Sequence, residues 1–327
     1  MYSVEELQKI VNEEIVKRTN ELKEKNPAEL YVPVNYSLEM GGKRLRPVLL
    51  LLGYNLFSDE LKNALPASVA IEVFHNFTLL HDDIMDHARV RRNQPTVHIQ
   101  FSENNAILSG DVMAFLSYQY LMECKSENLL NVVQLFTQTA IEVCEGQQLD
   151  MDFEERMNVS AADYLQMIRL KTAVLLACGL KAGALLGNAS EEVASHLYDF
   201  GLNLGMAFQL QDDLLDTFGD QQTFGKQIGG DILANKKTYL LIKALENASA
   251  VQRKKLVLWM DKTGYDAKTK IEAVTAIYNE LRIKETTAAK IDSYFQSSEK
   301  YLQSLPVDEM KKANLKNLSA KMLKRNH

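Results

Sequence analysis

The chain has 327 residues, a formal net charge of −6 and three cysteines. The acidic balance argues against a nucleic-acid partner, which would favour a basic surplus. The cysteines fit neither a disulfide framework nor a Cys-x-x-Cys metal site, so we expect Cys124, Cys144 and Cys178 to pack as small hydrophobic residues.

Apolar residues recur at intervals of three and four along most of the chain, which is the period of a helix. Residues 96–305 contain no proline, the strongest helix breaker. Asn-Gly and Asp-Gly dipeptides, which favour hairpins, are absent from the sequence. We therefore predict an all-α protein in which residues 1–327 form a single domain around one continuous core.

The chain contains no run of eighteen apolar residues, so we predict no membrane span. Residues 1–18 have the pattern of an amphipathic helix with acidic and basic side chains, and they lack the apolar centre of a signal peptide. These features predict a soluble protein of the cytoplasm.

Two basic segments, residues 41–47 and 89–95, flank the first long predicted helix. The earlier segment begins with two glycines, which free the backbone. Arginine offers a planar fork of donors that suits phosphate oxygens, and lysine acts as a point charge. Either segment alone would be read as a solvated loop. Their cations are Lys43, Arg44, Arg46, Arg89, Arg91 and Arg92.

Between these segments we predict a helix that ends near Asp86, because Pro66 suits a first helical turn and the apolar pattern then continues without a break. His75, Asp82 and Asp86 share one face of this helix. Asp82 and Asp86 lie one turn apart, where like charges repel. A hard divalent cation with oxygen ligands would compensate, which favours Mg²⁺ or Mn²⁺ over zinc.

The same Asp-Asp-x-x-Asp pattern returns at residues 212–216, where Asp212 and Asp216 again lie one turn apart. We expect Gly219 to end this helix, and Gly201 and Gly205 to let another helix approach closely. Apolar residues precede both motifs, which favours a cavity with a charged rim over a solvated helix face. Lys171, Lys226 and Lys236 accompany the motifs in sequence. A polyanion, most simply diphosphate, would satisfy both sets of charges.

Six segments in this order resemble the trans-isoprenyl diphosphate synthases, also called polyprenyl synthetases, and the resemblance covers about residues 38–245. The resemblance implies a bundle of long antiparallel helices around a central cavity, usually a homodimer. It also implies an enzyme that joins isopentenyl diphosphate to an allylic diphosphate with three Mg²⁺ ions per active site, Mn²⁺ being the alternative. The segments are GGKRLRP, LLHDDIMD, RRNQPTVH, Lys171-Thr172, FQLQDDLLD and GKQIGGDILANKKT.

The resemblance also implies roles for individual residues. The metal ligands would be Asp82, Asp86, Asp212 and Asp216. Isopentenyl diphosphate would bind to Lys43, Arg46, His75 and Arg92. The allylic diphosphate would bind to Arg91, Lys171, Thr172, Gln209, Lys226 and Lys236. The residues expected to act in catalysis are Asp82, Asp86, Lys171, Thr172, Gln209, Asp212 and Lys226.

Two positions depart from the family's usual pattern. Asn93 stands where glycine is common, and we expect the turn to persist because asparagine tolerates left-handed backbone. His87 follows the first motif where Asn, Asp or Glu is more usual, and we expect it to be a solvated loop residue.

In this family, residues four and five positions before the first motif help to set product length. Here they are Thr78 and Phe77, with Phe74 one turn deeper. This arrangement resembles the archaeal-type geranylgeranyl diphosphate synthases, so we expect geranylgeranyl diphosphate as the product. Farnesyl diphosphate or a longer polyprenyl diphosphate remains the alternative.

The sequence is also compatible with other functions. A class I terpene cyclase would share the fold and metal chemistry, and a non-catalytic partner subunit would share the fold. Glu72 and His75 form a Glu-x-x-His pattern, as in a di-iron carboxylate bundle, but a second copy at suitable spacing is missing. The residues after Asn247 suggest no chemistry, and we expect the basic tail, residues 321–327, to be a frayed end.

Overall fold

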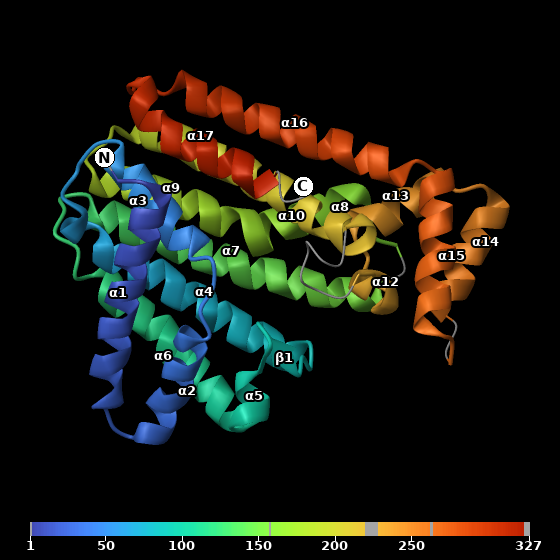
Figure 1. The fold of residues 1–327 in the computed structure, drawn as a ribbon, viewed down its shortest axis with the longest axis horizontal. Coiled ribbons are helices and arrows are strands. Elements are labelled where there is room, and N and C mark those ends of the chain that lie inside the picture. Colours follow the sequence, from blue (N-terminus) through green and yellow to red (C-terminus); the bar gives the residue numbers. More distant parts are fainter. Residues whose placement is uncertain (1, 157, 220–227, 262–263, 324–327) are drawn as a thin grey trace. The chain divides into compact units, whose positions relative to one another are not determined.

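The computed structural model describes residues 2–156, 158–219, 228–261 and 264–323. The described chain is almost entirely helical, with one two-stranded sheet, so the all-α prediction is confirmed (Figure 1). Its Cα atoms group into two compact units. The first comprises Met1–Thr139, Leu175–Tyr198 and Leu305–Leu315, and the second comprises Ala140–Val174, Asp199–Ser304 and Lys316–His327. A single domain stays a prediction.

In the first unit, the long helix α4 packs against α3 and α6, and α2 packs against α1 and α6. Helix α1 begins with a capping box, in which Ser3 and Glu6 bind each other's backbone N–H groups. Pro66 lies in the first turn of α4, as predicted, and Asp86 caps its last turn. The elements are α1 (Val4–Lys23), α2 (Ala28–Glu39), α3 (Leu45–Asn55), η1 (Leu61–Asn63), α4 (Leu65–Met85), β1 (Val90–Arg91), β2 (Gln94–Pro95), α5 (Val97–Gln100) and α6 (Glu103–Leu121).

Strands β1 and β2 form a short antiparallel hairpin that the sequence analysis did not predict. Val90 pairs with Pro95, and Arg91 pairs with Gln94. The two turn residues, Arg92 and Asn93, have φ angles of 52° and 61°. This left-handed pair is typical of the two-residue turns that join twisted strands. The expectation that Asn93 adopts left-handed backbone is therefore confirmed, and His87 is exposed as expected.

The second unit is built around a large cluster of buried side chains from the helices between Phe153 and Ile291. Helix α13 packs against α8, α15 and α16, and α15 packs against α12 and α14. The elements that follow α6 in the chain are α7 (Leu129–Glu155), α8 (Ala161–Ile168), a π-helical turn η2 (Arg169–Ala173), α9 (Val174–Leu186), α10 (Glu191–Phe218), α12 (Gly230–Leu233), α13 (Tyr239–Asn247), α14 (Ala250–Asp261), α15 (Ala267–Glu280), α16 (Ile283–Ser304) and α17 (Glu309–Leu323).

Glycines act as predicted at two points of α10. The helix ends at Phe218, and the Gly219 N–H binds the Leu215 carbonyl oxygen at 2.9 Å. A Cβ atom at Gly205 would lie 2.6 Å from Ala173 Cα, so this glycine permits close helix packing. The cysteine prediction is wrong in one case, because Cys144 is exposed on α7 whereas Cys124 and Cys178 are buried.

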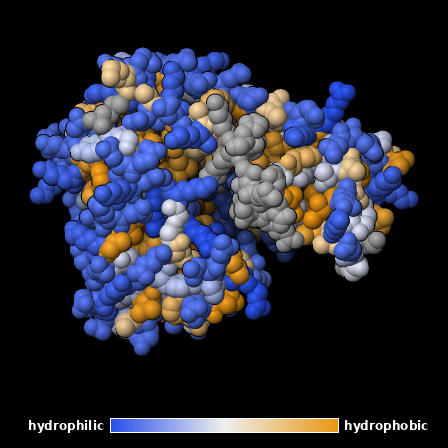
Figure 2. Space-filling model, viewed as in Figure 1, coloured by the Kyte–Doolittle hydropathy of each residue, from blue (hydrophilic) through white to orange (hydrophobic). Residues whose placement is uncertain are grey.

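The face of the molecule shown in Figure 2 is mostly hydrophilic, and hydrophobic residues gather on it in small separate groups. Within the described residues, no helix combines the length and the apolar character needed to cross a membrane.

Candidate active site

The first motif lies in the last turns of α4, in the first unit. Asp82 is half-buried and Asp86 is exposed. Between them, Asp83 is buried and accepts hydrogen bonds from Arg91 Nε at 2.9 Å and 2.8 Å through its two oxygens. Arg91 Nη2 also lies 3.5 Å from Asp82 Oδ2. Arg91, which was predicted to bind the allylic diphosphate, is thus held beside the motif by its middle aspartate.

The hairpin also brings Arg92 to the glycine-rich segment. Arg92 Nη1 donates to the Gly41 carbonyl oxygen. Gly42 has a φ angle of 140°, and a Cβ atom there would lie 2.9 Å from the Arg92 guanidinium. The two glycines therefore provide both the backbone conformation and the space that this arginine needs.

Arg46 and His75, both predicted to bind isopentenyl diphosphate, contact each other. Arg46 Nη1 lies 2.9 Å from His75 Nε2. A guanidinium can only donate, so Nε2 accepts and carries no proton. Burial first, and then the positive charge of Arg46, lower the pKa of His75 well below its ordinary value. Burial also lowers the pKa of Arg46 to about 10. Lys43, in the same predicted set, has an exposed side chain.

The three residues that were predicted to set product length lie close together on α4. Phe74 is buried, and Phe77 and Thr78 are half-buried. The Phe77 ring lies 5.4 Å from the Phe74 ring and 4.8 Å from His81. Phe136 on α7, which the sequence analysis missed, lies 5.2 Å from Phe74 and extends this aromatic group within the first unit. The Thr78 hydroxyl donates to the His75 carbonyl oxygen at 2.8 Å.

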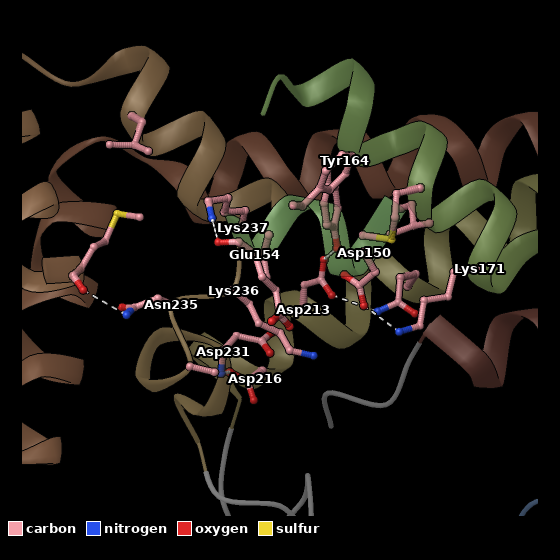
Figure 3. Close-up of a pocket in the computed structure, with 18 of the residues that line it drawn as sticks. Asp150, Glu154, Tyr164, Lys171, Asp213, Asp216, Asp231, Asn235, Lys236 and Lys237 are labelled. Atoms are coloured by element: carbon pink, nitrogen blue, oxygen red, sulfur yellow. Dashed lines mark hydrogen bonds and ion pairs between the residues drawn. The ribbon is translucent and has the colours of Figure 1, made fainter. Parts of the chain in front are cut away.

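The second motif lies on α10, in the second unit, and lines a cavity of about 700 Å³. Figure 3 shows acidic and basic side chains facing this cavity from several elements. Asp216 Oδ2 accepts the Asp231 backbone N–H at 2.9 Å, which ties the motif to α12. The charged lining residues are Asp150, Glu154, Lys171, Asp212, Asp213, Asp216, Asp231, Lys236, Lys237, Arg253 and Asp261.

Lys171 and Thr172 lie in the π-helical turn that interrupts the run from α8 to α9. Such turns are rare and frequently mark functional sites. Gly146 on α7 allows this turn to pack closely, because a Cβ atom there would lie 2.3 Å from the Lys171 backbone nitrogen. Lys171 Nζ forms an ion pair with Asp150 Oδ2 at 2.7 Å. Helical periodicity alone does not reveal this local change of winding.

A chain of hydrogen bonds connects the π-helical turn to the second motif. The Thr172 hydroxyl donates to Gln209 Oε1 at 3.1 Å, and Gln209 Nε2 donates to Asp213 Oδ1 at 3.0 Å. The Tyr164 hydroxyl donates to the other oxygen of Asp213. Burial, and then the charge of Asp231, raise the pKa of Asp213 to about 8. Through its two hydrogen bonds, Asp213 orients Tyr164 and Gln209 within the second unit.

The cavity in the second unit brings together several of the predicted residues. They are Thr172, Gln209, Asp212, Asp216 and Lys236. Lys226 lies outside the described residues. Tyr164, Asp150 and Asp231 were missed, because neither periodicity nor charge patterning reveals partners so far apart in sequence.

Carboxylates outnumber basic groups in this cavity, so its donor set fits hard cations. Among the residues that the structure describes, no three His, Cys, Asp or Glu side chains form a ready cage for one ion. Magnesium sites commonly use one or two carboxylates together with water and substrate phosphates. Paired aspartates on one helix face fit that pattern.

The polyprenyl synthetase family model matches residues 27–281. Over 222 residues, the chain is 44% identical to the geranylgeranyl diphosphate synthase of Methanosarcina mazei, covering 67% of this chain and 68% of that protein. A crystal structure of a geranylgeranyl pyrophosphate synthase aligns over 100% of both chains, with a TM-score of 0.93 and 41% identity. The geranylgeranyl pyrophosphate synthase of Corynebacterium glutamicum, solved with isoprenyl diphosphate and magnesium, aligns over 99% of this chain and 100% of that one, with a TM-score of 0.89 and 26% identity.

The chain therefore belongs to the polyprenyl synthetase family. It is a trans-prenyltransferase of the short-chain type, in a family that is generally metal-dependent. The predictions of family, fold and enzyme class are confirmed.

Proposed function

We propose that this prenyltransferase joins isopentenyl diphosphate to an allylic diphosphate, releases pyrophosphate and makes geranylgeranyl diphosphate. The observation that carries the proposal is the cavity of about 700 Å³ in the second unit, where Lys171 and Lys236 share the lining with Asp212 and Asp216. A diphosphate with bound cations satisfies both kinds of charge. The related Corynebacterium protein was crystallised with isoprenyl diphosphate and magnesium, which agrees with this proposal.

Asp212 and Asp216 would hold magnesium in the second unit, and Asp82 and Asp86 would hold it in the first. Bound magnesium would stabilise the negative charge that grows on the departing pyrophosphate. Three ions per site, with manganese as a substitute, follow the family's pattern. Lys171 and Lys236 add positive charge at the cavity. Lys236 would bind the diphosphate, and Lys171, fixed by its ion pair with Asp150 before the reaction starts, would also stabilise the leaving group.

In the reaction, the carbon–oxygen bond of the allylic diphosphate breaks and its electron pair leaves with pyrophosphate. The double bond of isopentenyl diphosphate then forms the new carbon–carbon bond, and a proton passes to pyrophosphate. The oxygens of Gln209 and Thr172 lie 3.1 Å apart and would direct the negative ends of their dipoles at the allylic cation. Asp213 holds the Gln209 NH₂ group away from that cation.

Isopentenyl diphosphate would bind in the first unit beside Arg46, His75 and Arg92. The Nε atom of Arg46 is buried and has no hydrogen-bond partner among the described residues. A buried donor without a partner is costly, and a phosphate oxygen would satisfy it. Lys43 would add a third cation from the loop that precedes α3.

Product length would be limited by the aromatic group below the first motif. Phe77 precedes Asp82 by five residues, which is about 7.5 Å along a helix. Its contacts with Phe74 and His81, and the contact of Phe74 with Phe136, hold the ring in place. The smaller side chain of Thr78 would leave space beside Phe77.

Pyrophosphate release tests the proposal against a cyclase. With magnesium present, the proposal predicts rapid release only when isopentenyl diphosphate and an allylic diphosphate are supplied together. A cyclase would release pyrophosphate from the allylic substrate alone. Equal rates with and without isopentenyl diphosphate would overturn the proposal.

We also propose a homodimer that associates through α6. Leu108, Phe115 and Met122 are 57%, 76% and 60% exposed and recur every seven residues, so they form one apolar stripe on and just beyond this helix. A second copy of the chain would bury it. We expect the wild type to sediment as a dimer and Phe115→Glu as a monomer. A monomeric wild type would contradict the proposed dimer.

The cytoplasmic location stays a prediction.

A further inference from the structure

Asn235 occupies a tight turn immediately before Lys236 at the cavity of the second unit. Its φ angle is 54°, a left-handed conformation that asparagine tolerates. The Asn235 side-chain Nδ2 donates to the Met260 carbonyl oxygen at 3.1 Å (Figure 3). The next backbone N–H, that of Lys236, donates to the Asp231 carbonyl oxygen at 2.9 Å. The position of Lys236 thus depends on a turn whose central side chain is tethered.

The second tether is Lys270, on α15. Its side chain is almost fully enclosed, at 1% exposure. Lys270 Nζ donates to Asn235 Oδ1 at 2.5 Å and to the Tyr265 hydroxyl at 3.1 Å, and it lies 4.6 Å from the centre of the Tyr265 ring. An ammonium group can only donate and a backbone carbonyl can only accept, so the two partners of Asn235 fix the orientation of its amide.

The same part of α15 supports the other end of this segment. Gly229 has a φ angle of 83°, and a Cβ atom there would lie 2.6 Å from Ile271 Cδ1. Lys270 and Ile271 are adjacent in sequence, so one turn of α15 contacts both Gly229 and Asn235. The segment between them carries Asp231, whose N–H binds Asp216 of the second motif. Helix α15, to which the sequence assigned no chemistry, therefore supports one wall of the cavity.

We propose that Lys270 is a positioning residue for diphosphate binding, which holds Lys236 at the cavity through Asn235. The proposal rests on the proposed function, because it assigns Lys236 to the allylic diphosphate. Burying an ammonium group beside neutral partners costs free energy. In return, the buried ammonium group of Lys270 holds the turn at Asn235 in one conformation. A flexible Lys236 would lose entropy on binding, which weakens affinity.

The first experiment compares Lys270→Met with a matched control, Lys268→Met. Lys268 lies on the same helix with 82% of its side chain exposed, and its ion pair with Glu272 spans 3.8 Å. We expect Lys270→Met to weaken magnesium-pyrophosphate binding, measured by calorimetry, about tenfold, which corresponds to about 1.4 kcal/mol. The KM for the allylic diphosphate should rise in parallel, while kcat changes little. Lys268→Met should match the wild type.

A double-mutant cycle separates positioning from a general loss of structure. If Lys270 acts through Lys236, then Lys270→Met should cause no further loss of pyrophosphate affinity in a Lys236→Met background. Additive losses, or wild-type affinity in Lys270→Met, would overturn the proposal. Lys270→Gln keeps a donor toward Asn235 and should recover part of the affinity; it also serves as the test variant if Lys270→Met does not fold. If the wild type binds pyrophosphate but elongates no substrate, the proposed function is wrong, but the double-mutant cycle still tests the positioning role of Lys270.

Discussion

Arg44 and Glu72 form an ion pair of 2.7 Å in the interior of the first unit, where their side chains are 4% and 3% exposed. Arg44 Nη2 also donates to the Leu38 carbonyl oxygen at 2.8 Å, and Asn76 Nδ2 contacts Glu72 Oε1 at 3.3 Å. Arg44 has a φ angle of 50° and directly precedes α3. The pair therefore fixes the end of the loop that carries Lys43 and the start of α3, whose first turn carries Arg46. It also gives Glu72 a role other than the iron ligand of a di-iron protein.

Glu72→Gln should destabilise the protein strongly, because it leaves the Arg44 charge buried without its counter-ion. We expect a loss of about 3 kcal/mol in the free energy of unfolding, measured by urea titration. The exposed pair of Lys9 and Glu13, at 3.9 Å, provides the control. Glu13→Gln should cost less than about 0.5 kcal/mol. Equal effects of the two substitutions would show that the buried pair is not important for stability.

Tyr164→Phe should slow catalysis more than it weakens binding. The substitution removes the hydroxyl that donates to Asp213, and Asp213 in turn holds the Gln209 amide. We expect kcat to fall about tenfold, equivalent to about 1.4 kcal/mol in the barrier, with KM values nearly unchanged. Tyr239→Phe, at another buried tyrosine of the second unit, is the control. A raised KM with normal kcat would place Tyr164 in binding instead.

Helical periodicity was sufficient to predict α4 and the end of α10, because each has a long apolar pattern and a clear terminating residue. It could not predict the hairpin at Arg92 and Asn93, whose turn lacks the usual glycine. Partners distant in sequence were also missed: Arg44 and Glu72 are 28 positions apart, and Asn235 and Lys270 are 35 apart. Such pairs depend on tertiary packing, which no local pattern records. The motifs predicted which residues form the site, and the structure shows which contacts hold those residues.

Phe77→Ala should lengthen the product. Removing this ring opens space above Phe74 on the same helix, so a growing prenyl chain can extend further before it meets a barrier. We expect products longer than geranylgeranyl diphosphate, identified by mass spectrometry after hydrolysis. Phe101→Ala, which removes a ring packed 5.4 Å from Tyr36, should keep the wild-type product. An unchanged product from Phe77→Ala would exclude Phe77 as the barrier.

Stability of the unliganded protein should fall in mild acid because of His75. Burial and Arg46 lower the folded-state pKa of His75 below its ordinary value of about 6.5. As the pH falls below that value, the unfolded state binds the proton more readily, so the free energy of unfolding decreases. His75→Gln removes this titration but keeps an acceptor for Arg46. Its unfolding free energy should decrease less than that of the wild type between about pH 7 and 5; parallel curves would contradict the assignment.

Product analysis is the most direct test of the proposed synthase reaction. Purified protein, magnesium and isopentenyl diphosphate are incubated separately with dimethylallyl, geranyl or farnesyl diphosphate, and the hydrolysed products are sized by mass spectrometry. We expect geranylgeraniol as the main final product from each primer, with no elongation once a chelator removes magnesium. A cyclic hydrocarbon, or no elongation from any primer, would contradict the proposed synthase reaction.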